Sequence, residues 1–257
     1  MAALGYLFDL GEVPYEEAWA LQRSLAAAVG QGAIPDSVIL LEHPPTITCG
    51  RRTGDKELHV PADADVTVVE TDRGGRSTFH GPGQLVCYPI LDLNRHGRDV
   101  KRYCRDLEES VINTLGGWEL EARRFDGLTG VWLDQPPRKI CSIGVHVSRW
   151  VTTHGYALNV ALDPAPFTEW ITACGLEDAA FTTIAAELDR DVTVDEVRGG
   201  AAEALAEVFD LTLERLPDSD LADHWPQPTH ERLAERDRAR PTRGEGPQST
   251  EETVSVR

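Results

Sequence analysis

Residues 66–91 read VTVVETDRGGRSTFHGPGQLVCYPIL, in which two apolar runs flank a glycine-rich segment. The flanks, residues 66–70 and 84–91, are rich in the β-branched, apolar and aromatic side chains that favour strands. Four glycines fall within residues 73–83, and glycine lets a backbone approach a ligand closely. The stretch predicts two strands, joined either by a binding loop or by a tight hairpin whose polar side chains are merely solvated.

Helices interrupt a mainly β succession on both sides of this stretch. Apolar spacing and cap residues predict helices at residues 14–29, 99–115, 167–173 and 193–209. Asp99 would cap the second of these, and Thr193 with Glu196 would form a capping box at the last. Further strands are expected at residues 3–10, 37–42, within 118–161 and at 211–216. This order predicts an α/β or α+β fold around one large sheet.

The domain organisation follows from length and composition. A chain of 257 residues is long enough to bury one substantial core. After Pro217 the chain becomes rich in proline and charge and poor in aliphatic side chains. Such a segment cannot bury enough apolar surface to offset the entropy lost on ordering it. We therefore expect one domain at residues 1–217 and a disordered tail at residues 218–257.

Cysteine usage and apolar patterning bear on the compartment. The first residues lack a basic segment and Asp9 interrupts them, which is not typical of a signal peptide. No apolar run approaches the roughly 18 residues that a membrane helix needs. The five cysteines are odd in number, widely spaced and without a CxxC, which favours free thiols in a reducing compartment. These features predict a cytoplasmic protein with no metal centre and no membrane contact.

The net charge of −18 is unevenly distributed along the chain. Such an acidic chain is not expected to bind nucleic acid. Residues 51–150 nevertheless hold 15 of the 25 basic residues, together with 15 acidic ones. The basic side chains either gather on one face that would steer an acidic protein partner, or are interspersed with acids on a mixed surface.

Two segments hold side chains suited to acyl transfer, RKICSIGVHV at residues 138–147 and FTEWITACGL at residues 167–176. A cysteine thiol is mostly protonated at neutral pH, and a nearby ammonium group lowers its pKa. Cys174 and Lys139 are therefore a candidate pair, although a cysteine before a glycine can also be a buried filler. Cys141 is the rival nucleophile. On a regular strand it would share a face with Lys139, and its apolar neighbours favour the core or the pocket wall.

Several separated blocks resemble one family, in the same order along the chain. They are RGGRSTFHGPGQLVCYPILDL (73–93), GLTGVWLD (127–134), RKICSIGVHVSRWVTTHGYALNV (138–160) and DPAPFTEWITACGL (163–176). Together they resemble the octanoyl-acyl-carrier-protein:protein octanoyltransferase family, and the resemblance spans residues 5–215. It implies the fold shared with lipoate- and biotin-protein ligases, an α/β domain with a central, largely antiparallel sheet flanked by helices.

The resemblance also implies roles for individual residues. Cys174 matches the family's acyl-thioester nucleophile, and Lys139 matches the lysine that lowers the pKa of that cysteine. Three stretches match the family's substrate contacts: Arg73, Gly74, Gly75, Arg76, Ser77, Thr78, Phe79 and His80; Ser142, Ile143 and Gly144; Gly155, Tyr156 and Ala157. His146 and His154 lack the spacing of metal ligands and are expected at the strand surface or behind the site.

The implied reaction needs no cofactor. Octanoyl on acyl carrier protein is already an activated thioester, so it can pass to a cysteine and then to a lysine amine without ATP. The implied acceptors are the lipoyl domains of 2-oxoacid dehydrogenase E2 subunits and the glycine cleavage H protein. Two alternatives stay open. An ATP-dependent lipoate- or biotin-protein ligase would not need the cysteine, and a non-catalytic module that binds acyl carrier protein would never become acylated.

Overall fold

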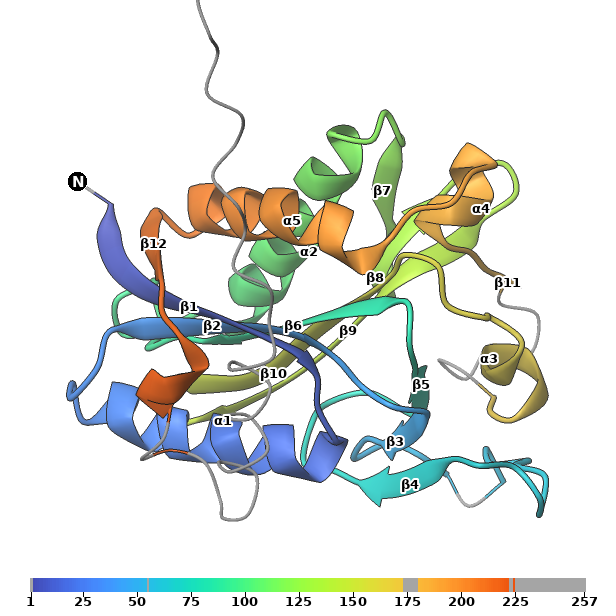
Figure 1. Cartoon of the computed structure of the whole chain (residues 1–257), viewed down its shortest axis with the longest axis horizontal. Helices are drawn as coiled ribbons and strands as arrows, with labels where there is room; N and C mark the ends of the chain where they lie inside the picture. Colours follow the sequence, from blue (N-terminus) through green and yellow to red (C-terminus); the bar gives the residue numbers. More distant parts are fainter. Residues whose placement is uncertain (1, 55, 173–179, 222–223, 225–257) are drawn as a thin grey trace, which may run out of the picture.

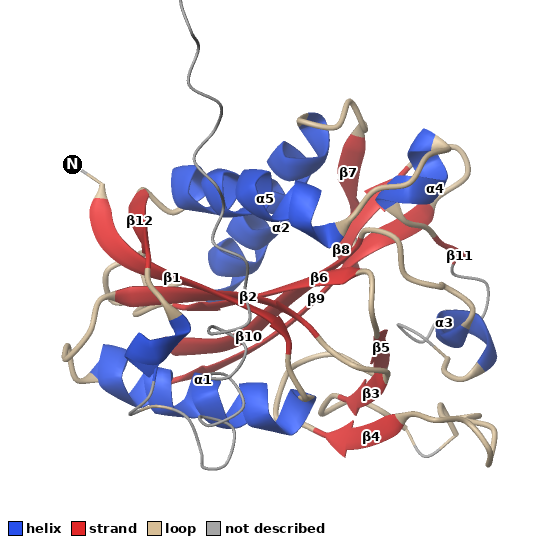
Figure 2. Cartoon of the chain, in the orientation of Figure 1, coloured by secondary structure: helices blue, strands red, loops and turns tan. Residues whose placement is uncertain are grey.

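The computed structural model describes residues 2–54, 56–172, 180–221 and 224. A nine-stranded sheet runs through its centre (Figure 2). The strands are β1 (Ala3–Glu12), β2 (Asp36–Glu42), β6 (Gln84–Ile90), β7 (Ala122–Phe125), β8 (Leu128–Leu133), β9 (Arg138–Ser148), β10 (Val151–Asn159), β11 (Ala180–Phe181) and β12 (Leu211–Arg215). The strand order is β12-β1-β2-β6-β10-β9-β8-β7. β1 pairs in parallel with both β12 and β2, and every later pairing along this order is antiparallel. β11 lies off this order and pairs in parallel with β9. The expected largely antiparallel sheet is confirmed.

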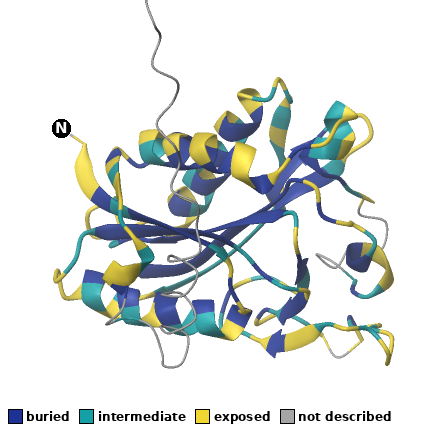
Figure 3. Cartoon of the chain, viewed as in Figure 1, coloured by how far each residue is buried: buried dark blue, intermediate teal, exposed yellow. Residues whose placement is uncertain are grey.

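Three long helices cover the two faces of this sheet (Figure 1). α2 (Val100–Gly116) and α5 (Val194–Val208) lie on one face, and α1 (Tyr15–Gly30) lies on the other. Apolar side chains of the central strands alternate between two cores, so that Leu40 of β2 joins the core under α2 and α5 and Ile39 joins the core under α1. Both layers are buried along the middle of the sheet (Figure 3).

The predicted helix starts are confirmed. The Asp99 carboxylate accepts hydrogen bonds from the backbone N–H groups of Lys101 and Arg102, and Thr193 and Glu196 form the expected capping box. The remaining helices are short: α3 (Pro166–Glu169), α4 (Ile184–Leu188) and the 3₁₀ helix η2 (Asp218–Leu221). Across the described parts of the chain, every helix is too short or too polar to cross a membrane.

A second, three-stranded sheet differs from the expectation of a single sheet. Its strands are β3 (Thr46–Cys49), β4 (Thr67–Glu70) and β5 (Thr78–His80), in the order β4-β3-β5. β3 begins directly after a pair of prolines, and β5 lies within the glycine-rich segment. The strand expected at residues 66–70 is confirmed as β4, whereas β3 and β5 are too short to show alternation in a sequence. The glycine-rich segment therefore holds a strand as well as a loop.

The chain continues to pack beyond the expected end of the domain. Leu221 of η2 is fully buried in the core under α1, and Nδ1 of His224 lies 3.1 Å from the hydroxyl of Ser24. The packed domain thus extends at least to η2. Residues 225–257, which hold most of the expected tail, lie outside the described residues, so their disorder stays a prediction.

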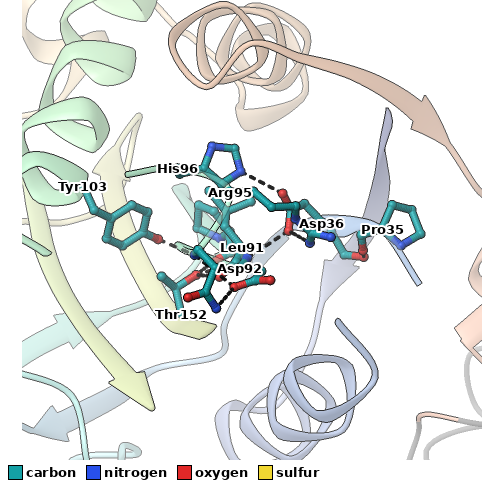
Figure 4. A network of polar contacts seen from close by, with 11 residues as sticks. Pro35, Asp36, Leu91, Asp92, Arg95, His96, Tyr103 and Thr152 are labelled. Carbon is teal, nitrogen blue, oxygen red and sulfur yellow. Dashed lines mark hydrogen bonds and ion pairs between the residues drawn. The ribbon is translucent and has the colours of Figure 1, made fainter. Parts of the chain in front are cut away.

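Asp36 ties the start of β2 to the loop after β6 (Figure 4). Its carboxylate accepts a hydrogen bond from the backbone N–H of Asp92 at 2.9 Å and one from Arg95, and it lies 2.8 Å from Nε2 of His96. The side chain is 3% exposed. Burial raises the pKa of Asp36, but the hydrogen bonds from His96, Asp92 and Arg95 outweigh burial and hold the pKa below its ordinary value of 3.8.

We expect Asp36→Asn to lower the free energy of unfolding by about 2 kcal/mol at pH 7, because the buried carboxylate loses its charge-assisted hydrogen bonds to His96 and to Arg95, whose side chain is partly exposed. A carboxyl group whose pKa is depressed by folding stabilises the fold above its unfolded pKa and loses that contribution as pH falls through the folded value. In urea denaturation, the difference between the two proteins should therefore be full at pH 7 and shrink below pH 3.8. A difference that does not change with pH would contradict a role for the charge.

Candidate active site

A cavity of about 220 Å³ lies between Tyr15 at the start of α1, the glycine-rich segment and the central sheet. The sheet contributes residues of β6, β8, β9 and β10, and the turn between β7 and β8 adds Gly127. All three stretches predicted to contact substrate reach this cavity, and so does Lys139. The fold therefore brings together segments that are far apart in the sequence.

A buried arginine holds the glycine-rich segment in place. Arg73 is 6% exposed, and its Nη2 donates to the carbonyl oxygen of Thr48 in β3 at 2.6 Å. The N–H of Gly74 donates to the carbonyl oxygen of Val145 in β9 at 2.9 Å. A Cβ on Gly144 would lie 3.0 Å from the oxygen of Gly74, so a side chain there would push the segment slightly away from β9. The segment is thus joined to both sheets.

Side chains of the glycine-rich segment separate onto two sides. The residues that line the cavity are Arg73, Gly75, Arg76, Ser77, Thr78 and His80. Phe79 points the other way because neighbours in β5 alternate, and its ring centre lies 5.9 Å from those of Phe167 and Trp170. Gly74 is also outside the cavity lining. Phe79 and Gly74 therefore shape the segment, and their predicted contact with substrate rests on the resemblance alone.

The other two predicted stretches are neighbouring strands. Their antiparallel register pairs Ser142 with Ala157, Ile143 with Tyr156 and Gly144 with Gly155. All six residues line the cavity. A Cβ on Gly155 would lie 2.2 Å from the carbonyl oxygen of Cys87 in β6, so any side chain there would force β6 and β10 apart. Two separated stretches of sequence thus form one continuous wall.

A β-bulge in β9 turns Lys139 toward the cavity. In the pairing with β8, Trp132 lies opposite Lys139 and Val131 lies opposite Cys141, so Ile140 is the extra, unpaired residue of the bulge. Ile140 and Cys141 both join the core under α2, whereas Lys139 lines the cavity together with Ser142. The prediction that Lys139 and Cys141 share a face is wrong, because it assumed a regular strand. Lys139 is 3% exposed, and its Nζ lies 5.3 Å from the centre of the Trp132 ring.

Aromatic and histidine side chains line the part of the cavity next to α1. The hydroxyl of Tyr15 lies 3.2 Å from Nδ1 of His154, whose Nε2 lies 2.8 Å from the carboxylate of Asp72. Burial lowers the pKa of His80 and of His154 and raises the pKa of Tyr15 to about 12. Burial therefore disfavours the charged forms of Tyr15, His80 and His154. Within the described ranges, no three or more His, Cys, Asp or Glu side chains are arranged to hold a metal ion.

His154 lines the cavity itself rather than lying at the strand surface or behind the site. Its φ of 58° is in the left-handed region, which residues other than glycine rarely adopt. Its backbone N–H donates to the side chain of Gln22 in α1 at 2.6 Å. A strand pattern gives no signal for such a backbone change, so sequence reasoning missed His154 and its partner Tyr15. His146 stays half-buried near Asp72.

The four cysteines that the structure describes are poor nucleophiles. Burial raises the pKa of the thiols of Cys49 and Cys141, and it raises those of Cys87 and Cys104 to about 12 and about 11. The thiolate is the reactive form of cysteine, so a raised pKa disfavours each of these thiols as a nucleophile at neutral pH. Cys174, the predicted nucleophile, lies outside the described residues.

The described chain on both sides of the segment with the predicted nucleophile lies near the cavity wall. Before the segment, the N–H of Thr172 donates to the carbonyl oxygen of Glu57 at 2.9 Å, and the Glu57 carboxylate pairs with Arg76. After it, Phe181 of β11 pairs with Lys139 in β9. The chain after the segment therefore pairs with the cavity-lining Lys139, and the chain before it is linked to the cavity-lining Arg76 through Glu57.

About half of the fifteen basic residues at positions 51–150 pair with an acidic side chain nearby. Seven form ion pairs: Arg76 with Glu57, Arg95 with Asp36, Arg102 with Asp106, Arg105 with Glu108, Arg123 with Asp134, Arg124 with Glu108 and Arg138 with Glu187. These pairs lie on several helices and strands. They favour a mixed surface over one basic face.

Comparison with known proteins identifies the family. The model of the lipoyl protein ligase A/B catalytic domain matches residues 14–206. Proteins named octanoyltransferase from Mycobacterium tuberculosis and Chloroflexus aggregans are 51% and 46% identical to the chain, over 80% of its length and 87% and 95% of theirs. The chain belongs to the octanoyltransferase family. It is therefore a transferase that moves octanoyl groups in protein lipoylation.

Solved lipoate-protein ligases share the fold of this octanoyltransferase. A bi-partite lipoate protein ligase from Thermoplasma acidophilum matches it with a TM-score of 0.68 over 91% of both chains, at 16% identity. Lipoate-protein ligase A bound with ATP gives a TM-score of 0.67 at 15% identity, covering 92% of this chain and 94% of the ligase. At these identities the likeness concerns the fold alone. It confirms the lipoate-ligase fold that the family resemblance implied.

Proposed function

We propose that the octanoyl group comes from octanoyl-acyl carrier protein and passes, through a thioester on Cys174, to the lysine amine of a lipoyl domain. The observation that carries the proposal is the buried ammonium group of Lys139, in one cavity with the three stretches that match the family's substrate contacts. Val86, Leu128 and Trp132 give the same cavity apolar walls suited to an alkyl chain.

The proposed reaction has two balanced steps. The thiolate of Cys174 attacks the thioester carbonyl, and the carrier's thiolate leaves with a proton from Lys139. The neutral acceptor amine then attacks the acyl-enzyme, the bond to Cys174 breaks, and the amine's proton passes to Lys139. One thioester and one amine thus become one thiol and one amide, which leaves Cys174 as thiolate and Lys139 protonated.

Two observations support Cys174 as the nucleophile. The thiols of the other four cysteines have raised pKa values, and Cys141 lies in the core on the other face of the sheet from Ser142. In addition, the segment that holds Cys174 is followed by Phe181, which pairs with Lys139. The raised pKa values thus argue against the four described thiols as the nucleophile.

The proposed acceptors are lipoyl domains of 2-oxoacid dehydrogenase E2 subunits and the glycine cleavage H protein. The solved ligase from Thermoplasma acidophilum belongs to a lipoylation system with an E2 lipoyl domain, which makes such a domain a reasonable partner for the shared fold. We place the reaction in the cytoplasm because the cysteine usage fits a reducing compartment. We propose no cofactor, nucleic acid or membrane partner.

The second candidate is an ATP-dependent lipoate-protein ligase, which the fold likeness to lipoate-protein ligase A bound with ATP favours. Such a ligase would activate a free acid as an adenylate, with no covalent acyl-enzyme. The much higher identity to octanoyltransferases favours the thioester route.

Intact-mass spectrometry after mixing the protein with octanoyl-acyl carrier protein separates these possibilities. We expect one added octanoyl group, removed by hydroxylamine and transferred to a lipoyl domain when one is supplied. Unmodified protein that octanoylates the lipoyl domain only with free octanoate, ATP and Mg²⁺ would establish the ligase instead. Binding of octanoyl-acyl carrier protein with neither adduct nor transfer would indicate a non-catalytic module.

A further inference from the structure

Gly130 lies against the side chain of Lys139. It is buried in β8, with a φ of 117° that favours glycine. A Cβ at this position would lie 2.5 Å from the carbonyl oxygen of Cys141, 2.7 Å from Cε of Lys139 and 3.2 Å from its Nζ. Trp132, two residues further along β8, has its ring centre 5.3 Å from the same Nζ. The end of the lysine side chain therefore lies beside the bare backbone of Gly130 and near the ring of Trp132.

We propose that Gly130 is a positioning residue for Lys139, because only a residue without a side chain leaves the space in which the ammonium group lies. The proposal rests on the proposed role of Lys139 in proton transfer. Gly130 does not line the cavity itself, so it would act through Lys139 and not through contact with substrate.

The surroundings fix Gly130 where it stands. Its N–H donates to Oε1 of Glu108 at 3.1 Å, and Oε2 of the same carboxylate accepts from Nε of Arg124 at 3.0 Å. Glu108 comes from α2 and is 3% exposed. On the other side, the carbonyl oxygen of Cys141 belongs to the neighbouring strand and cannot retreat without disturbing the sheet. An added methyl group would thus have to shift the backbone of β8 or β9 away from the Cys141 oxygen and also displace the end of the Lys139 side chain.

The size of the displacement can be estimated. Non-bonded carbon atoms rest at about 3.5–4.0 Å, so Cε of Lys139 would have to move by about 1 Å. A misplacement of about 1 Å in a catalytic group can lower a rate by about 10²-fold. We expect Gly130→Ala to reduce the rate of acyl-enzyme formation by about that factor, with the affinity for octanoyl-acyl carrier protein unchanged.

The chain offers a direct view of Lys139, because its only lysines are Lys56, Lys101 and Lys139. Protein labelled with ¹³C at lysine Cε gives three assignable signals. Gly130→Ala should move the signal of Lys139 and leave those of the exposed Lys56 and Lys101 in place. Gly97→Ala is the matched control, since Gly97 also has a positive φ, of 88°, but no atom within 4 Å of an added Cβ. It should change neither the three signals nor the acylation rate.

A second pair of variants covers the case in which Gly130→Ala does not fold. Glu108→Ala removes the acceptor that holds Gly130, whereas Glu108→Gln keeps an oxygen in the same place. We expect the Lys139 signal and the acylation rate to change in the alanine variant and to return toward normal in the glutamine variant.

The outcomes separate this proposal from the proposed function. A Lys139 signal that is unmoved in folded Gly130→Ala, or in both Glu108 variants, would overturn the positioning role. If Lys139→Met is inactive, a Lys139 signal that moves in Gly130→Ala without any loss of acylation rate would also overturn the positioning role. A fully active Lys139→Met would instead refute the proposed function of Lys139 while leaving the spectroscopic result to stand.

Discussion

Cys174→Ala is expected to abolish the octanoyl adduct and to lower transfer to lipoyl domains by about 10⁴-fold or more, as the loss of a covalent nucleophile does in other enzymes. Cys141→Ala is expected to keep both. Its thiol is fully buried and burial raises its pKa, so it should not be acylated. Removing this one buried sulfur atom should cost about 1 kcal/mol of stability. Intact-mass spectrometry and single-turnover transfer measure the two effects in parallel.

The comparison is balanced because each variant loses a single thiol from the same chain. Thermal melts of both variants show whether a lost activity reflects unfolding. An octanoyl adduct of normal yield on Cys174→Ala, mapped by peptide analysis to Cys141, would reassign the nucleophile. The bulge would then have to allow Cys141 to reach the cavity, in conflict with its place in the core under α2.

The sequence predicts the long elements of this fold well because they repeat their signals. α1, α2 and α5 each bury several apolar residues at helical spacing, and the caps at Asp99 and Thr193 mark where two of them begin. β3 and β5 have four and three residues, and no pattern can emerge over that length. Of the second sheet, the sequence therefore predicts only β4, and the pairing of its three strands appears only once the chain is folded.

The site shows the same division. The family resemblance located most of the lining residues in the glycine-rich segment, β9 and β10. Only the fold shows that they line one cavity, because strand pairings such as Gly144 with Gly155 bring β9 and β10 side by side. Alternation alone gave the wrong relation between Lys139 and Cys141, because one extra residue in β9 reverses the parity. Likewise, the left-handed backbone at His154 has no signature in an otherwise regular strand pattern. Local irregularities thus decide which side chains reach the cavity.

Lys139→Arg and Lys139→Met test whether Lys139 supplies charge alone or also moves protons. Arginine keeps a positive charge but stays protonated, so it can stabilise a thiolate without accepting a proton. We expect the arginine variant to form the acyl-enzyme at a useful rate but to transfer the acyl group to the acceptor amine about 10²–10⁴-fold more slowly, the range for loss of a general acid–base group. The methionine variant should be slow in both steps, because it also removes the charge.

Single-turnover measurement of each half-reaction distinguishes these roles. Acylation is followed by intact mass with octanoyl-acyl carrier protein alone, and transfer is followed by adding a lipoyl domain to acylated enzyme. Arginine is bulkier than lysine, and Gly130 leaves little room beyond Cε, so a slow acylation step in Lys139→Arg would report crowding in addition to lost proton transfer. Near-normal rates in both steps for Lys139→Arg would leave Lys139 with charge alone. Near-normal rates for Lys139→Met would show that Lys139 has no catalytic role. Another group would then have to accept the proton of the amine, and Tyr15 and His154 are candidates because both line the cavity.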